Sequence, residues 1–330
     1  MNNTSLKYKS TMTKTGVILL IFVGFLTVFM SVYFVLPADL LPENVYAIVD
    51  SVIYDVAYLA SFMLPVAFVP IVFSREERQP MRLAPKLSAN TFAFIFIGVA
   101  FTYAFSYINS AVVTAIFGDP TVEELFAYAP VYMSDSDVIL QFITIALVPA
   151  FCEEFLFRGV VLSNLMPYGK STAVVVSAVC FGLMHGNLYQ FLYTTVAGLI
   201  LGVVYVVTDS IWPSTIIHMI NNALSVMQTV IFERMEEDAA YTVWLAIECF
   251  VFAVGVLSFI CLLKRYKSKE NAKESVFGKP INDDLSGEAS GFWGHNRLDA
   301  KDAVKAFFAP TVLAFVIYAI LEAFAAHWMV

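Results

Sequence analysis

The chain has 330 residues, of which 59% are hydrophobic and only 14% charged, and its formal net charge is −8. Soluble domains carry about 25% charged residues, so this composition excludes an ordinary water-soluble domain and indicates a protein surrounded by lipid. The charges lie in separate loops and form no basic face, which excludes a nucleic-acid-binding surface.

Nine apolar stretches follow one another along the chain. A membrane-spanning helix needs about 20 apolar residues, and the candidates cover residues 16–36, 52–73, 90–117, 137–165, 171–186, 188–207, 210–231, 241–263 and 306–328. The fourth is long and carries charges near its middle, and the fifth is short. The sequence therefore predicts an all-α fold, a polytopic membrane helical bundle of about eight to nine transmembrane helices.

Lysine and arginine set the orientation of such a bundle, because they concentrate in cytoplasmic loops. With the N-terminus inside, all but one of the 19 lysines and arginines fall on the inner side, and the exception is Arg234. We therefore expect a multi-pass protein of the cell membrane with a cytoplasmic N-terminus. No small-residue cleavage site follows the first apolar stretch, so we expect that helix to be retained.

All four cysteines lie in apolar stretches, and none is in a CxxC spacing. They are Cys152, Cys180, Cys249 and Cys261. We expect buried free thiols rather than disulfides or metal ligands.

Ionisable side chains interrupt the fourth apolar stretch. Glu154 and Arg158 are four residues apart and share one helical face, where they can neutralise each other. Glu153 points about 100° away and has no local partner. An unpaired carboxylate in a membrane is a candidate functional group, and a general base or acid is its plausible role. The alternative is a structural ion-pair cluster that holds helices together.

Two histidines lie in the apolar stretches that follow. His185 ends the short fifth stretch, four residues after Phe181. His218 begins a His-x-x-x-Asn pattern that places Asn222 on the same helical face. The helix lengths allow both histidines to reach the depth of Glu153 at a rise of 1.5 Å per residue.

Together, Glu153-Glu154-x-x-x-Arg158, Phe181-x-x-x-His185 and His218-x-x-x-Asn222 resemble the EExxxR, FxxxH and HxxxN motifs of one family. It is the CAAX protease and bacteriocin-processing (CPBP, or Abi) family, which includes the type II CAAX prenyl endopeptidases, and the resemblance covers about residues 137–230. It implies an intramembrane endopeptidase in which Glu153 activates water and His185 shares that role. It further implies that His218 and Asn222 stabilise the oxyanion, while Glu154 and Arg158 give structural support.

This interpretation divides the chain into five parts. They are N-terminal transmembrane helices (1–136), a CPBP catalytic core (137–231), an eighth transmembrane helix (232–264), a polar cytoplasmic linker (265–305) and a C-terminal transmembrane helix (306–330).

Several alternatives stay open at this point. We expect no cofactor, but Glu153, His185 and His218 are also suitable zinc ligands for metal-assisted hydrolysis. The expected partners are membrane lipid and a peptide or membrane-protein substrate, with a prenylated CAAX tail among the candidates. Two different classes compete with the protease: a non-catalytic peptide-binding or bacteriocin immunity protein, and a transporter with the buried charges as an ion path.

Overall fold

A computed structural model describes residues 3–35, 43–118, 135–271 and 300–328, and the elements in these ranges are all helical. The first three helices are α1 (Asn3–Val35), α2 (Glu43–Val72) and α3 (Ala89–Phe117). One long helix follows in consecutive segments: α5 (Asp135–Gln141), η2 (Phe142–Leu147), α6 (Val148–Glu154), η3 (Phe155–Leu162), α7 (Ser163–Leu165) and η4 (Met166–Tyr168). The rest are α8 (Lys170–Met184), α9 (Leu188–Thr208), α10 (Ile211–Arg234), α11 (Glu237–Asn271), α12 (Ala300–Phe307) and α13 (Pro310–Trp328).

The predicted polytopic membrane bundle is confirmed. In the described part of the chain, seven helices are long and apolar enough to cross a membrane, and α8 and α13 are shorter apolar helices. α11 extends to Asn271, past the end of the eighth predicted stretch, and α12 begins in the predicted polar linker and ends two residues after it. The remainder of that linker, residues 272–299, lies outside the described residues.

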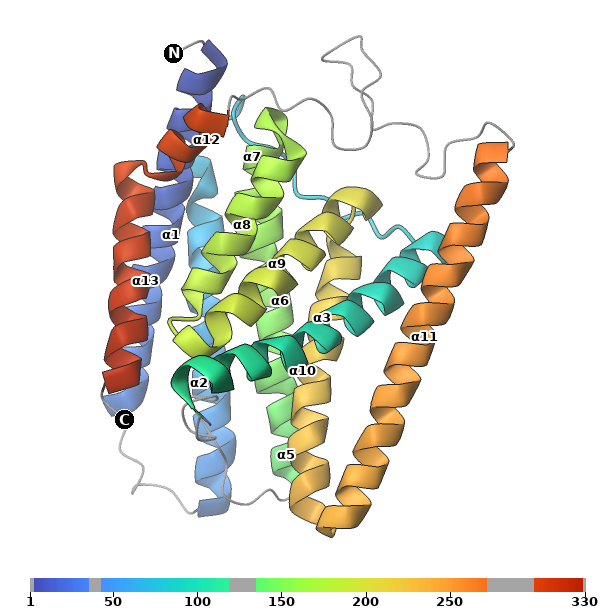
Figure 1. The fold of residues 1–330 in the computed structure, drawn as a ribbon. Helices are drawn as coiled ribbons and strands as arrows, with labels where there is room; N and C mark the ends of the chain where they lie inside the picture. The colour runs from blue at the N-terminus through green and yellow to red at the C-terminus, as the bar shows by residue number, and fades with distance from the viewer. Residues whose placement is uncertain (1–2, 36–42, 119–134, 272–299, 329–330) are drawn as a thin grey trace.

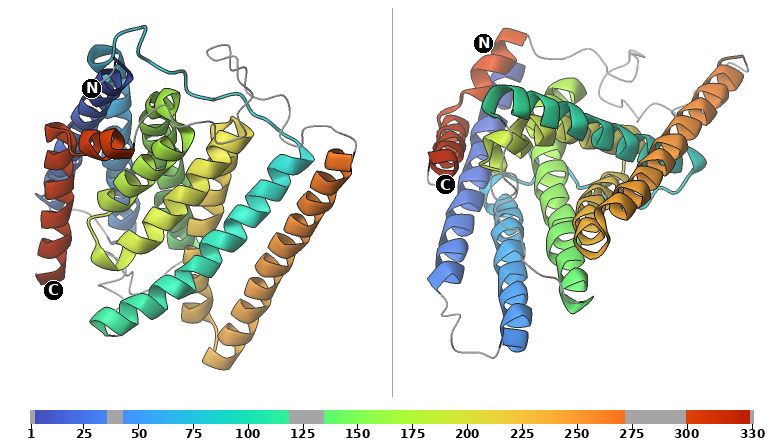
Figure 2. Two further views of the ribbon diagram at one scale, coloured as in Figure 1. Left: turned by 45° about the horizontal axis from the view of Figure 1, so that its top comes forward. Right: turned by 60° about the horizontal axis from the view of Figure 1, so that its bottom comes forward.

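The helices surround a central group formed by α6, α8, α9 and α10 (Figure 1). α1 packs between α2 and α13 at one edge of the bundle, whereas α11 stands at the opposite edge and packs mainly against α3. α3 crosses the bundle obliquely and covers α9 and α10 (Figure 2). The long helix that carries the paired glutamates is therefore enclosed by helices distant in sequence.

The helices of the central group approach one another closely. A β-carbon added at Gly198 of α9 would lie 3.0 Å from the backbone of Ala178 in α8. Small residues of this kind allow membrane helices to pack through van der Waals contact, because lipid gives no hydrophobic force between them. The close α8–α9 hairpin follows from this approach.

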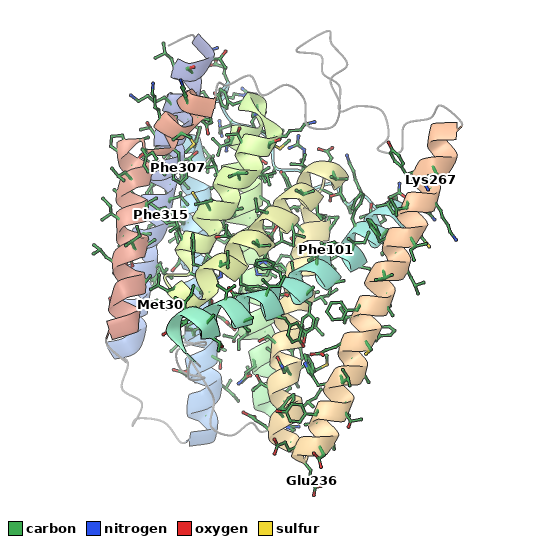
Figure 3. All side chains as sticks on the ribbon, in the orientation of Figure 1. Met30, Phe101, Glu236, Lys267, Phe307 and Phe315 are labelled. Atoms are coloured by element: carbon green, nitrogen blue, oxygen red, sulfur yellow. The ribbon has the colours of Figure 1, made fainter. Side chains whose placement is uncertain are left out.

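The cysteine prediction is wrong for two of the four residues. Cys152 and Cys180 are buried, but Cys249 and Cys261 are exposed on α11, and all four are free thiols. α11 packs against α3 and α10, and many of its side chains project away from the rest of the bundle (Figure 3). An apolar sequence does not require burial in protein when the surrounding solvent is lipid.

Candidate active site

The paired glutamates lie in a helix with irregular hydrogen bonding. α6 is flanked by the π-helical segments η2 and η3, where the backbone widens to bonds between residues five apart, as Val148 N–H to the Ile143 carbonyl shows. Single π-turns inside helices are frequent at functional sites. Glu153 and Glu154 are both buried, with exposed fractions of 4% and 0%. The widened turns thus bracket two carboxylates held inside the bundle.

Glu154 and Arg158 form the ion pair that their spacing predicts. Arg158 Nη1 lies 2.7 Å from Glu154 Oε1, and both side chains are fully buried. The contact is an ion pair rather than an aligned hydrogen bond, because the N–H directions of Nη1 do not meet an acceptor. Arg158 also donates from Nη2 to the Gly198 carbonyl at 3.2 Å and lies 4.5 Å above the ring of Phe181. Arg158 therefore ties the long helix to both α8 and α9.

His218 stands between the two carboxylates. Its Nδ1 lies 3.3 Å from Glu154 Oε1, and its Nε2 lies 3.8 Å from Glu153 Oε2. The first distance is within hydrogen-bond reach, whereas the second is too long for a direct bond. A single water oxygen at about 2.8 Å from each atom would bridge the longer gap. The imidazole is thus oriented by Glu154 and turns its other nitrogen toward Glu153.

His185 follows the C-terminal end of α8, a helix that is too short to span a bilayer. α8 has 15 residues, or about 22 Å at 1.5 Å per residue, against a hydrocarbon core of about 30 Å. The chain then turns at Gly186, whose φ of 55° suits a residue without a β-carbon. His185 Nδ1 lies 2.9 Å from the Phe181 carbonyl. Because that carbonyl can only accept, Nδ1 carries the proton and a neutral ring keeps a free lone pair on Nε2.

The side chain of Asn222 is held by a hydrogen bond to a backbone carbonyl, which lacks its usual helical donor because a proline follows four residues later. Pro149 has no N–H to donate to the Ile145 carbonyl four residues earlier, and Asn222 Nδ2 donates to that carbonyl at 3.0 Å. Asn221 Nδ2 in turn donates to Asn222 Oδ1 at 3.4 Å. Both amides therefore line the site, and the i+4 pattern that favours Asn222 does not exclude Asn221.

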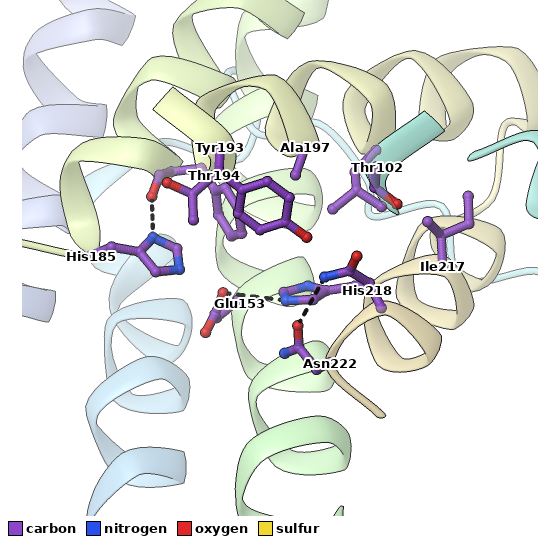
Figure 4. Close-up of a pocket in the computed structure, with 12 residues that line it drawn as sticks. Thr102, Glu153, His185, Tyr193, Thr194, Ala197, Ile217, His218 and Asn222 are labelled. Atoms are coloured by element: carbon purple, nitrogen blue, oxygen red, sulfur yellow. Dashed lines mark hydrogen bonds and ion pairs between the residues drawn. The ribbon is translucent and has the colours of Figure 1, made fainter. Parts of the chain in front are cut away.

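One small cavity brings the sequence-predicted residues together. Glu153, His185, His218 and Asn222 all line it, in a volume of about 60 Å³ (Figure 4). Glu154 and Arg158 are not among the lining residues and lie behind the cavity wall. A cavity of this size has room for a few water molecules. It is far smaller than the roughly 300 Å³ or more of a typical ligand pocket.

Further lining residues were not anticipated from the sequence. They include Thr102 from α3 and Tyr193 and Thr194 from α9. Phe181, the first residue of the FxxxH motif, also lines the cavity, and its ring meets the rings of His185 and His218 edge-on at 5.1 and 5.7 Å. A residue that contacts Glu153 from outside the cavity was also missed.

That residue is Tyr58 of α2, whose phenol donates to Glu153 Oε1 at 2.5 Å. A signal was available, because Asp55 and Tyr58 place polar groups one turn apart within an apolar stretch, where such groups are functional candidates by default.

One of the three comparisons with known proteins finds a match, and it covers the region that carries the motifs. Residues 135–224 match a family model described as type II CAAX prenyl endopeptidase Rce1-like. The match contains all three motifs and confirms the resemblance that they carry. Comparison with curated proteins finds no match, and neither does comparison with solved structures.

The Rce1-like match supports an intramembrane endopeptidase in general, acting on a peptide substrate from within a multi-pass membrane protein. Its range runs from α5 into α10 and so includes every predicted site residue. It leaves out α2 and α3, which supply Tyr58 and Thr102.

The Rce1-like region does not present a ready zinc site. In the ranges that the structure describes, no three His, Cys, Asp or Glu side chains converge closely enough to hold a metal ion. Glu153, His185 and His218 border the same cavity, but zinc needs its ligand atoms within about 2.0–2.2 Å of one point. The donor set as placed therefore does not fit the zinc alternative.

Proposed function

We propose that the protein is an intramembrane endopeptidase that hydrolyses a peptide bond with a water molecule activated by Glu153 and His185, without a metal ion. The observation that carries this proposal is the convergence of Glu153, His185, His218 and Asn222 on one buried, water-sized cavity. Ionisable groups inside a membrane protein are costly to bury, so a cluster of them around one cavity indicates a functional site. The Rce1-like match supports the same reaction class.

In the proposed step, a water oxygen attacks the carbonyl carbon of the scissile peptide while Glu153 Oε2 takes one of its protons. The free lone pair of His185 Nε2 accepts a hydrogen bond from the same water and orients it. The tetrahedral intermediate then collapses, the C–N bond breaks, and Glu153 returns the proton to the departing amine nitrogen. General-base and general-acid roles thus alternate on one carboxylate.

Hydrogen-bond donors on α10 are assigned to stabilise the negative charge that develops on the carbonyl oxygen. His218 and Asn222 are one helical turn apart, and fixed donors in a site with little water stabilise developing charge strongly. The imidazole of His218 lies 3.3 Å from Glu154, and a ring protonated on both nitrogens donates to Glu154 through Nδ1 and to the oxyanion through Nε2. Glu154 and Arg158 are therefore assigned to structural support behind the cavity.

The proposal extends to topology and substrate. The positive-inside distribution of lysine and arginine supports a cell-membrane protein with a cytoplasmic N-terminus. Peptides and membrane proteins are the substrate class, and a prenylated CAAX tail is one candidate within it. The cavity of about 60 Å³ is too small for a peptide, so substrate entry requires the surrounding helices to move apart.

The test is a cleavage assay with purified protein in detergent. A quenched fluorescent peptide library that includes a farnesylated CAAX peptide is offered to the wild type, Glu153→Gln and His218→Ala, each with and without a strong zinc chelator. We expect cleavage by the wild type in both conditions and a loss of at least about 100-fold in each variant, the scale seen when one catalytic donor or base is removed.

The other outcomes separate the alternatives. Cleavage abolished by the chelator and restored by zinc would assign the same three residues to metal ligation. Peptide binding without cleavage by well-folded wild type would favour a binding or immunity protein. Ion-dependent solute flux in proteoliposomes, lost in Glu153→Gln, would favour a transporter.

A further inference from the structure

Glu153 receives a hydrogen bond from a helix that lies outside the matched residues. The phenol of Tyr58 on α2 donates to Glu153 Oε1 at 2.5 Å, and the family match begins only at residue 135. The other carboxylate oxygen, Oε2, is buried, has no hydrogen-bond partner among the described residues, and lies 3.8 Å from His218 Nε2. The two oxygens of one carboxylate are therefore placed in different environments.

The position of the Tyr58 phenol is itself constrained. Its ring packs against Phe62 with the centroids 4.8 Å apart and stacks on Tyr54 at 5.9 Å. Phe62 is 1% exposed and belongs to the main hydrophobic core. Packing on both sides along α2 leaves the phenol little freedom to leave Glu153, since a buried ring moves only if its neighbours move.

A second polar contact joins the same two helices, one turn earlier on α2 and more than two turns earlier on the long helix. Thr144 Oγ1 in η2 donates to Asp55 Oδ2 in α2 at 3.1 Å. Side-chain hydrogen bonds between membrane helices fix their relative position. α2 is thus attached to the long helix at two levels, and one of the two contacts is made to Glu153 itself.

We propose that Tyr58 is a positioning residue for the peptidase reaction, holding Glu153 Oε1 so that Oε2 faces the cavity and receives the proton of water. The inference rests on the proposed function. The terminal torsion of a glutamate side chain is broad, so an unrestrained carboxylate would sample orientations in which neither oxygen points into the cavity. A short hydrogen bond to a carboxylate is charge-assisted and directional, which is what such a restraint requires.

The test compares Tyr58→Phe with the wild type on the best peptide of the library. The ring and its packing stay, and only the donor is lost. We expect kcat to fall about 10- to 100-fold, the equivalent of one hydrogen bond to a charged group, with KM within about twofold, because the phenol contacts the base rather than the substrate. Incorporation of 3-fluorotyrosine at position 58 keeps the donor and is expected to keep kcat within about threefold.

A matched control is available elsewhere in the membrane. Tyr103 on α3 donates to Glu248 Oε1 on α11 at 2.9 Å, and Glu248 also accepts from Tyr107. Tyr103→Phe removes the same kind of tyrosine–carboxylate contact between two helices, away from Glu153. We expect a similar small loss of thermal stability in both variants but an unchanged kcat in Tyr103→Phe.

The outcomes are distinguishable from those that test the function. If the wild type cleaves, Glu153→Gln does not, and Tyr58→Phe keeps the wild-type kcat, the positioning role is overturned while the endopeptidase stands. A rise in KM with unchanged kcat overturns it as well, since that result places Tyr58 in substrate binding. Absence of cleavage by the wild type overturns the function and this inference together. If Tyr58→Phe does not fold, 4-fluorophenylalanine at position 58 replaces it, because this side chain nearly matches the phenol in size but cannot donate; the same fall in kcat is expected, and a wild-type kcat overturns the positioning role.

Discussion

Arg158→Met should be one of the most destabilising single substitutions in this protein. Arg158 is the largest fully buried side chain among the described residues, and its charge is balanced by Glu154 at 2.7 Å. Methionine fills much of the same volume and carries no charge. The substitution therefore removes the cation while Glu154 stays in place, with no exposed surface through which water could solvate it.

The expected magnitude follows from the burial of both partners. Breaking a buried ion pair on one side costs about 3–5 kcal/mol, because an uncompensated charge remains. The hydrogen bond from Arg158 to the Gly198 carbonyl and the contact with the Phe181 ring are lost as well. The contact of His218 with Glu154 offsets part of this cost. We therefore expect a loss of about 3–5 kcal/mol, or a lowering of Tm by roughly 6–15 °C at about 2–3 °C per kcal/mol for a chain of this size.

The cysteines supply the assay. Cys152 and Cys180 are buried near the site, whereas Cys249 and Cys261 are exposed. In a background with Cys249→Ala and Cys261→Ala, a thiol-reactive fluorogenic dye reports only the opening of the bundle around Cys152 and Cys180. Thermal unfolding of the detergent-solubilised protein is then followed by dye fluorescence for the wild-type site and for Arg158→Met.

The decisive comparison is a double-mutant cycle. Glu154→Gln removes the other charge, and in Glu154→Gln with Arg158→Met no buried ionic charge of the pair remains. We expect the double variant to be more stable than the sum of the two single losses predicts, by about 1–3 kcal/mol. A lowering of Tm by less than about 2 °C in Arg158→Met, or strict additivity in the cycle, would refute the assignment of a coupled structural ion pair.

Two further predictions concern the ion pairs of Asp209 and the exposure of the four cysteines. Burial raises the pKa of Asp209, but its contacts with Lys86 and Arg82 outweigh burial and hold that pKa below its usual value. A carboxyl group whose pKa is lowered on folding stabilises the folded protein above about pH 3.9, the unfolded value. This stabilisation is lost as the pH falls through the pKa of the folded state. Thermal scans from pH 6 to pH 3 should therefore show a steeper loss of Tm below about pH 4 in the wild type than in Asp209→Asn, and parallel curves would contradict this linkage. In the unaltered chain, a small lipophilic maleimide should label Cys249 and Cys261 before heating, and Cys152 and Cys180 only after unfolding, as peptide mass mapping would show.

The helices and the identity of the motif residues were predictable from sequence for physical reasons. Length and apolarity determine a membrane helix directly, because unsatisfied backbone groups are too costly in lipid to permit other spanning structures. The pairing of Glu154 with Arg158 is local, and helix periodicity determines it. The length of the short fifth stretch likewise places His185 inside the bundle. These features depend on residues close to one another along the chain.

The parts that escaped prediction depend on contacts between distant helices. Which side of α11 meets α3 determines the exposure of Cys249 and Cys261, and an apolar helix in lipid carries no pattern that reveals it. The two π-helical segments also had no recognisable signal, apart from Pro149, whose missing N–H leaves a carbonyl for Asn222. The contact of Tyr58 with Glu153 spans 95 residues, which local periodicity does not register.

The motif region alone is therefore an incomplete account of the site. Residues 135–224 contain every charged or imidazole group that the proposed step uses, but within that region nothing described donates to Glu153 Oε1. The donor comes from α2, and Thr102 of α3 closes another side of the cavity. In the proposed step Glu153 needs one oxygen restrained and the other available, and the hydrogen bond from Tyr58 would supply that restraint from outside the motifs. The N-terminal helices thus complete the site as well as anchoring it in the membrane.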